Sequence, residues 1–436
     1  MGYSEPLAAP NAGPVTAAER LVSLDTLRGV AVMGILVMNV YAFAMPLAAY
    51  YNPLIMGGSD ALNMGVWFVT HLLFDQKFMS IFSMLYGAGL VMMMNRAESR
   101  GVDFAAVFYR RSAWLMALGL LHAYFIWFGD ILFHYALMGM AVFLLRKASP
   151  KTLIVVACVM LPVALLFNFG GSFYMEELQA DVSRIEERLA QGATLDEEQQ
   201  RKLEEWREIR PVFAPSDQDI KAEVTAYRGS YVDALMQRAP IVAFMQANLT
   251  LVFVVWRVGG LMLLGMALMK LGVLSGERST RFYRKLTVVG YGVGLPLAVA
   301  SALLLEAHQF EPIYVARFGG VPNYFGSILV AFGHVGAVML VVKSGTLRAI
   351  VDRFAAVGRM ALSNYLAQSL VMTTLFYGCG LGLYGDVTRV WQQALVVVLV
   401  GLQLLVSVWW LKYFRFGPVE WLWRSLAYRQ RQPMRR

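Results

Sequence analysis

The apolar stretch GVAVMGILVMNVYAFAMPLA, residues 29–48, decides the fold class of this chain. It carries no charged side chain, and a helix of about 20 apolar residues is long enough to cross the hydrocarbon core of a bilayer. Similar stretches recur along the 436 residues, of which 58% are hydrophobic and 15% charged. Soluble domains contain about 45–50% and about 25% of these classes. The composition therefore predicts an all-α, polytopic integral membrane protein.

Ten segments are expected to span the membrane. They are residues 29–48, 66–94, 112–128, 131–146, 152–170, 241–269, 286–305, 323–342, 357–378 and 390–411. The second segment is too long for one straight span and is interrupted at residues 75–77, which predicts a break there. Lys and Arg are concentrated in alternate connections, so the positive-inside rule places both termini in the cytoplasm. This pattern accounts for the net charge of +9 without a nucleic-acid partner.

The span pattern divides the chain into five parts. We expect a cytoplasmic N-terminal segment (1–28), a first membrane bundle (29–171), an extracytoplasmic helical insertion (172–240), a second membrane bundle (241–411) and a basic cytoplasmic tail (412–436). Acidic residues outnumber basic ones in the insertion, which is interpreted as a solvated cap or as a lid that binds an acceptor. Cys158 and Cys379 both lie in apolar stretches, so neither a disulfide framework nor a metal site is expected.

Spans one and three carry polar residues at the same spacing. Arg28 and Asn39 are eleven residues apart, and so are Arg111 and His122. Eleven residues are about three helical turns, which places each pair on one helix face. Asp25 can pair with Arg28 across one turn. These residues are interpreted either as a helix-end ion pair with packing side chains or as an inner-face site for an anionic ligand.

Other polar residues also lie at unexpected depth. His122 and Asp130 bracket a short hairpin, and a carboxylate that bonds one ring nitrogen leaves the other as a general base. Arg257 falls near the middle of span six, where insertion costs about 2.5–3.5 kcal/mol. It is expected either to be neutralised by a carboxylate such as Asp130 or to bind substrate. Asn364 and Gln368 form a polar stripe on span nine that either joins helices or lines a site.

Long blocks of the chain resemble the YeiB-like family of bacterial membrane proteins. The resemblance is carried by ERLVSLDTLRGVAVMGILVMN (19–39), DQKFMSIFSMLYGAGL (75–90), LGLLHAYFIWFGDILFHYALMG (118–139), LMLLGMALMKLGVL (261–274), VGRMALSNYLAQSLVMTTLFYG (357–378) and YFRFGPVEWLWRSL (413–426). It covers nearly the whole chain and implies a location in the bacterial cytoplasmic (inner) membrane.

The SLDTLRG opening and Asn39 are also similar to heparan-α-glucosaminide N-acetyltransferase and, more distantly, to the acyltransferase-3 membrane enzymes. That similarity implies a transmembrane acyltransferase, with Asp25, Arg28 and Asn39 matching the shared opening. In the glucosaminide family a catalytic histidine follows the first span. Residues 47–65 of this chain contain no histidine, and the nearest is His71, so His122 is the expected substitute.

The function expected from the sequence is transfer of an acyl group from cytoplasmic acyl-CoA, such as acetyl-CoA, to a sugar or other hydroxyl- or amine-bearing acceptor. His122 and Asp130 are the catalytic candidates. The candidates for binding acyl-CoA or substrate are Asp25, Arg28, Asn39, Arg110, Arg111, Arg257, Arg359, Asn364 and Gln368. The alternatives are a small-solute transporter that uses Arg257, His122 and Asp130, or a non-catalytic scaffold or sensor. The sequence leaves a homo-oligomer open.

Overall fold

The computed structural model describes residues 21–99, 101 and 104–436, so most of the expected N-terminal segment lies outside the described residues. Every named element in this part is a helix, which confirms the all-α class. The elements are α1 (Val22–Ala44), α2 (Leu47–Tyr51), α3 (Ala61–Leu73), α4 (Lys77–Ser99), α5 (Phe104–Phe125), α6 (Leu132–Val142), η2 (Phe143–Leu145), α7 (Pro150–Ala190), α8 (Glu197–Phe213), α9 (Asp217–Arg228), α10 (Tyr231–Phe244), η3 (Met245–Val258), α11 (Gly259–Lys270), α12 (Thr280–Ala307), α13 (Pro312–Tyr314), η4 (Val315–Gly319), α14 (Val321–Ser344), α15 (Arg348–Arg359), α16 (Ala361–Phe376), α17 (Arg389–Tyr413) and α18 (Pro418–Tyr428).

Within the described residues, eight helical segments are long and apolar enough to cross a membrane. They are Val22–Ala44, Ala61–Ser99, Phe104–Phe125, Pro150–Ala190, Tyr231–Lys270, Thr280–Ala307, Val321–Ser344 and Arg389–Tyr413. The expected fourth and ninth spans correspond to shorter helices, Leu132–Leu145 and the 16-residue α16. A 16-residue helix rises about 24 Å, less than the bilayer core of about 30 Å.

The expected ninth span, 357–378, is divided at Met360 because the acidic side chain of α18 reaches the start of α16. Glu420 Oε1 accepts hydrogen bonds from the backbone N–H groups of Leu362 (2.7 Å) and Ser363 (3.0 Å). These donors have no partner within their own helix. Glu420 therefore stabilises a new helix start, and α15 remains a separate amphipathic helix.

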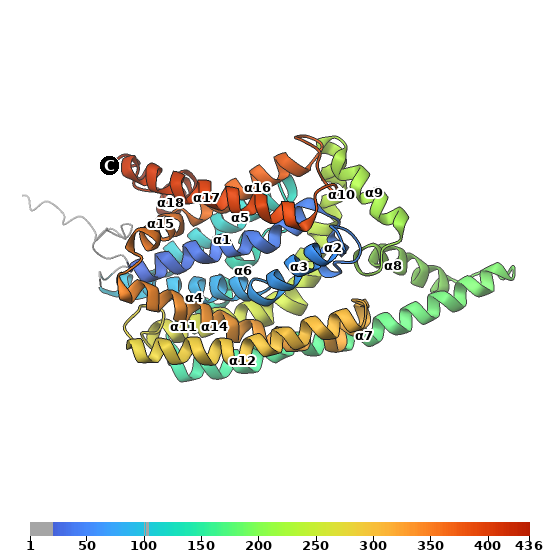
Figure 1. Cartoon of the computed structure of the whole chain (residues 1–436), viewed down its shortest axis with the longest axis horizontal. Coiled ribbons are helices and arrows are strands. Elements are labelled where there is room, and N and C mark those ends of the chain that lie inside the picture. The colour runs from blue at the N-terminus through green and yellow to red at the C-terminus, as the bar shows by residue number, and fades with distance from the viewer. Residues whose placement is uncertain (1–20, 100, 102–103) are drawn as a thin grey trace, which may run out of the picture.

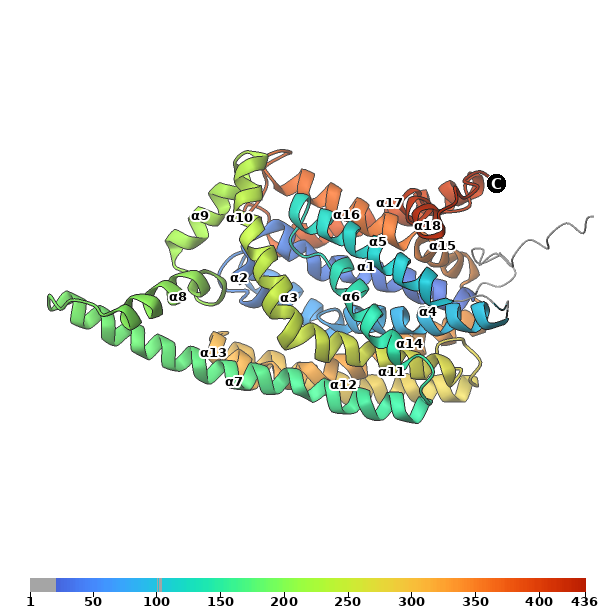
Figure 2. The ribbon, with the colours of Figure 1, turned by 180° about the vertical axis from the view of Figure 1, so that it is seen from behind.

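The helices lie roughly side by side along the long axis of the molecule (Figures 1 and 2). The start of α1 and the chain's C-terminus lie at the same end, which we call the basic end because Arg28, Arg96 and Arg359 are located there. At the opposite end, the 41-residue α7 continues beyond the bundle as an arm, and α8 returns along it. Leu178, Val182 and Ile185 of α7 form a small apolar cluster with Leu203 of α8.

Helices of the two expected five-span bundles, 29–171 and 241–411, pack directly against one another. α1 packs against α15, α16 and α17, and α4 packs against α11. Glycines permit these approaches: a Cβ on Gly29 would overlap the carbonyl oxygen of Phe354, and one on Gly87 would overlap that of Met262. Small residues let membrane helices pack closely, so the two sequence halves interleave into one bundle.

Candidate functional site

The hairpin between α5 and α6 turns inside the bundle rather than at its surface. α5 has 22 residues, whereas α6 and η2 together span only Leu132–Leu145. The connecting residues 126–131 are largely enclosed by protein, with Trp127 2%, Phe128 4% and Asp130 4% exposed. Non-helical backbone is tolerated inside a membrane bundle where protein surrounds it.

Residues of α10 hold the carboxyl end of α5 in this position. Arg238 Nε donates to the carbonyl oxygen of Tyr124 (2.9 Å), and its Nη1 donates to that of Ile126 (3.1 Å). The Tyr231 hydroxyl donates to the carbonyl oxygen of Phe125 (2.8 Å). The last carbonyls of a helix lack partners in the helix and favour a cation. The insertion thereby positions His122, which lies in the last turn of α5.

Three buried side chains form a hydrogen-bonded chain at this hairpin. His122 Nδ1 lies 2.9 Å from Asp130 Oδ1, and His122 Nε2 lies 2.9 Å from the hydroxyl of Ser369 in α16. Asp130 Oδ2 also accepts the backbone N–H of Phe133 (2.8 Å). His122 and Ser369 are each 1% exposed. The order carboxylate–imidazole–hydroxyl is that of a Ser–His–Asp triad.

His122 and Asp130 were predicted from the sequence as catalytic candidates, whereas Ser369 was not. Ser369 lies in the run SLVMTT, in which no charge or spacing marks it. It is 247 residues from His122 along the chain, so its contact depends on how α16 packs against α5. We found no local sequence signal that distinguishes Ser369 from a packing serine.

A cavity of about 280 Å³ extends into the bundle from the basic end. Six arginines line it together with two acidic residues: Arg28, Arg96, Arg111, Arg359, Arg415, Arg424, Asp25 and Glu420. Its deeper lining is mainly apolar and includes Leu115, Leu132 and Tyr365. The Tyr365 ring centroid lies 5.2 Å from that of His122, and the Tyr365 hydroxyl donates to the carbonyl oxygen of Gly129 (3.3 Å). Tyr365 therefore forms part of the wall between the cavity and the triad.

Only some of the predicted binding residues of the first, third and ninth spans line the cavity. Asp25, Arg28, Arg111 and Arg359 line the cavity. Asp25 and Arg28 pair at 3.2 Å, and the Arg111 guanidinium lies 4.2 Å from the centroid of a Trp423 ring. Arg110 and Asn39 are not among the lining residues; Arg110 Nε donates to the carbonyl oxygen of Ala427 in α18.

Asn364 and Gln368 face α17 rather than the cavity. Asn364 Nδ2 donates to the Ser407 hydroxyl (3.1 Å), and Gln368 Nε2 donates to Gln403 Oε1 (2.9 Å). All four side chains are buried between the two helices. This is the helix-joining role that the sequence left open, and it places both residues outside the cavity lining.

Arg257 lies in a different cluster from His122 and Asp130. It is in the π-helical stretch η3, where its Nη1 donates to the carbonyl oxygen of Tyr324 (3.1 Å) and its Nη2 donates to the Ser327 hydroxyl (2.7 Å). Its guanidinium also lies 4.1 Å from the Tyr324 ring centroid. Asp130 does not neutralise the Arg257 guanidinium, as the sequence had suggested, because Asp130 bonds to His122 at the α5–α6 hairpin.

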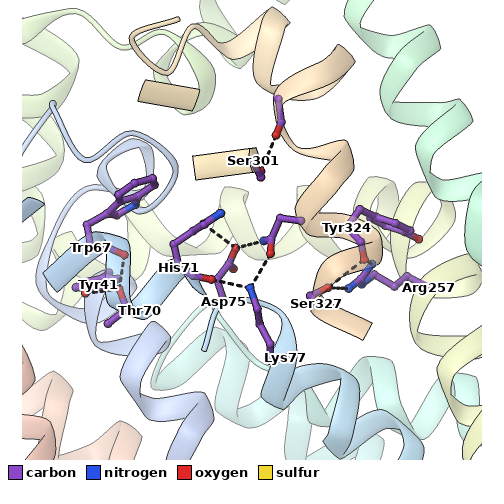
Figure 3. Close-up of polar contacts among 12 residues, drawn as sticks. Tyr41, Trp67, Thr70, His71, Asp75, Lys77, Arg257, Ser301, Tyr324 and Ser327 are labelled. Atoms are coloured by element: carbon purple, nitrogen blue, oxygen red, sulfur yellow. Dashed lines mark hydrogen bonds and ion pairs between the residues drawn. The ribbon is translucent and has the colours of Figure 1, made fainter. Parts of the chain in front are cut away.

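The break between α3 and α4, expected at residues 75–77, is confirmed and is surrounded by polar groups (Figure 3). Lys77 Nζ donates to the carbonyl oxygen of His71 and to Asn323 Oδ1, both at 2.6 Å. Asn323 Nδ2 donates in turn to Asp75 Oδ2 (2.8 Å). Lys77 is 0% exposed, so these bonds replace the hydration of a buried ammonium group.

Across the described residues, no group of three or more His, Cys, Asp or Glu side chains is placed to hold a metal ion. The charged side chains that line the cavity are mainly arginines. Guanidinium groups bind carboxylates and phosphates through paired hydrogen bonds. The chemistry of this site therefore favours an anionic ligand with an apolar part.

Known proteins match nearly the full length of the chain. Residues 268–430 match a family model described as "Protein of unknown function (DUF418)". The chain is 32% identical to the uncharacterized protein YeiB of Escherichia coli (strain K12), over 95% of this chain and 98% of the relative. It is 31% identical to the uncharacterized protein YxaH of Bacillus subtilis (strain 168), over 97% of each chain.

Proposed function

The chain belongs to the YeiB-like family of membrane proteins, and from this premise and the site geometry we propose that it is an acyl-CoA-dependent acyltransferase. It takes an acyl group such as acetyl from acyl-CoA in the cytoplasm and transfers it to a small hydroxyl- or amine-bearing acceptor in or across the bacterial inner membrane. The basic end of the bundle is then the cytoplasmic end, in agreement with the positive-inside rule.

One observation carries this proposal: the cavity that six arginines line at the basic end extends inward to Tyr365, whose ring lies beside that of His122. Acyl-CoA has phosphates at one end and a thioester at the end of a flexible arm. The phosphates match the arginines. The arm matches the mainly apolar lining below them, which directs the thioester toward Tyr365.

His122 is the general base of the proposed reaction. Because Asp130 Oδ1 is 2.9 Å from Nδ1, the carboxylate favours the tautomer with its proton on Nδ1. The lone pair of Nε2 is then available to accept a proton from a nucleophile. Asp130 stabilises the imidazolium that forms, as the carboxylate of a catalytic triad does.

The test is acetyl-CoA binding and turnover by the purified protein in nanodiscs. Arg111→Ala removes one cavity-lining guanidinium, and hydrogen bonds to charged groups contribute about 1.5–3 kcal/mol. We therefore expect Kd to rise by about tenfold to about a hundredfold. Arg110→Ala is the matched control, since the neighbouring Arg110 bonds to α18 and does not line the cavity.

His122→Ala should bind acetyl-CoA normally and release no free CoA. If Arg111→Ala binds as tightly as wild type, the cavity is not the CoA site. If the wild type neither binds nor consumes any of several acyl-CoAs, the acyltransferase proposal is wrong.

A second candidate function, transport of a small solute, is favoured by the polar break between α3 and α4. Interrupted membrane helices with buried charges are typical of transporter binding sites. In that case the solute site lies near Lys77, Asp75 and Arg257, away from His122. A transporter moves solute without consuming acyl-CoA, and Arg257→Gln would change transport while leaving CoA binding intact.

A further inference from the structure

We infer that Ser369 is the nucleophile of the proposed acyltransferase and carries the acyl group as a covalent serine ester between donor and acceptor. This inference rests on the proposed function. It adds a modification site, the Ser369 Oγ, and divides the transfer into two chemical steps.

The contacts of the hydroxyl support this role. Ser369 Oγ has two neighbours: His122 Nε2 at 2.9 Å and the carbonyl oxygen of Tyr365, one turn back in α16, at 3.3 Å. A packing serine in a membrane helix commonly bonds the carbonyl four residues earlier. Here the shorter contact is to an imidazole whose other nitrogen is held by a carboxylate. An adjacent base held by a third group is the arrangement that activates a serine.

The position of the triad explains why two steps are useful. The cavity that admits acyl-CoA opens toward the basic end, and its arginines are all near that end. Tyr365 separates the cavity from the triad, with its ring 5.2 Å from His122. A shift of this side chain brings a thioester at the deep end of the cavity within reach of Ser369. An ester on Ser369 then lets CoA depart before an acceptor arrives from the opposite side.

The two steps balance in atoms and protons. In the first, His122 Nε2 takes the proton of the Ser369 hydroxyl, and Oγ attacks the thioester carbonyl carbon. The carbon–sulfur bond breaks, and the departing CoA sulfur receives the proton from His122. In the second, His122 takes a proton from the acceptor hydroxyl or amine, which attacks the ester carbonyl. The bond to Oγ breaks, and Ser369 recovers its proton from His122.

The experiment is the exchange of isotopically labelled CoA into unlabelled acetyl-CoA by the full-length protein in nanodiscs, with no acceptor added. A covalent intermediate makes this exchange possible because the first step is reversible. The wild type should exchange label, and after acid quench a peptide containing Ser369 should carry one acetyl group. Ser369→Ala should bind acetyl-CoA with unchanged affinity and lose exchange by about a thousandfold or more.

Thr374→Val is the control, since Thr374 lies on the same helix but is exposed and bonds to the carbonyl oxygen of Leu370. Ser369→Cys provides a second test should the alanine variant fail to fold, because it should trap the acetyl group as a thioester that neutral hydroxylamine cleaves. Thermal unfolding checks the fold of each variant.

The outcomes separate the two proposals. If the wild type transfers acetyl to an acceptor but shows no exchange, or if folded Ser369→Ala retains turnover, the serine ester is wrong and direct transfer stands. An acetyl group found on another residue also overturns it. If the wild type neither binds nor consumes acyl-CoA, the proposed function itself fails.

Discussion

Filling the cavity without disturbing the fold is the most direct test of the site. Gly89 of α4 lines the cavity, and a Cβ placed on it meets no atom within 4 Å. Gly89→Leu therefore puts a branched side chain into the space that acyl-CoA is proposed to occupy. Gly401 of α17 is the matched control, since its Cβ also meets nothing within 4 Å and it is exposed outside the cavity.

The expected effect follows from the four side-chain carbons of leucine. If they displace an equal number of ligand carbons from apolar contact, at about 0.8 kcal/mol for each buried methylene, binding loses about 3 kcal/mol. That is about a 200-fold rise in Kd for acetyl-CoA. Both substitutions replace a helical glycine with a better helix former, so neither should lower stability, and each favours the helix by up to about 1 kcal/mol.

The assay is equilibrium binding of acetyl-CoA to wild type, Gly89→Leu and Gly401→Leu in nanodiscs, with thermal unfolding of each. Wild-type affinity in folded Gly89→Leu would refute the assignment of the cavity. Equal losses in both variants would instead point to a general effect of leucine in these helices.

Three further predictions concern stability, each measured by chemical or thermal unfolding in detergent. Arg238→Met should lower the free energy of unfolding by about 3–5 kcal/mol, because helix-end carbonyls of α5 lose a cationic donor. The control is Arg184→Met, which should change this free energy by less than about 1 kcal/mol because the Arg184 side chain is 70% exposed. Burial raises the pKa of the Glu420 carboxyl in the folded protein, partly offset by hydrogen bonds from Ser363. The protonated Glu420 carboxyl therefore contributes its full stabilisation below the unfolded-state pKa, and this contribution is lost as pH rises through the folded-state pKa. The free energy of unfolding of the wild type should fall with rising pH in that window. In Glu420→Gln the dependence of this free energy on pH should be weaker. Lys77→Met should cost about 3 kcal/mol by leaving buried acceptors without a donor, and adding Asp75→Asn should recover part of this loss. An unchanged unfolding midpoint in Arg238→Met or Lys77→Met would contradict the contacts on which these predictions rest, and an unchanged pH slope in Glu420→Gln would contradict the one for Glu420.

The membrane class and most of the spans were predictable because they depend on local properties. A run such as 29–48 is apolar over the length of a bilayer core, whatever the rest of the chain does. The break at residues 75–77 was likewise visible, since Asp75 and Lys77 interrupt an apolar run. The division of the ninth span at Met360 was not, because the stabilising carboxylate comes from Glu420, about 60 residues later.

By itself, the sequence determined a helical membrane protein, its basic end and two members of the candidate triad, His122 and Asp130, which are only eight residues apart. The tertiary structure alone decided that Ser369 completes the triad, that Arg257 bonds to α14 instead of Asp130, and that Asn364 joins two helices. The physical reason is the same in each case. Hydrophobicity and helix length are properties of single segments, whereas the partner of a buried polar side chain depends on which helices pack together.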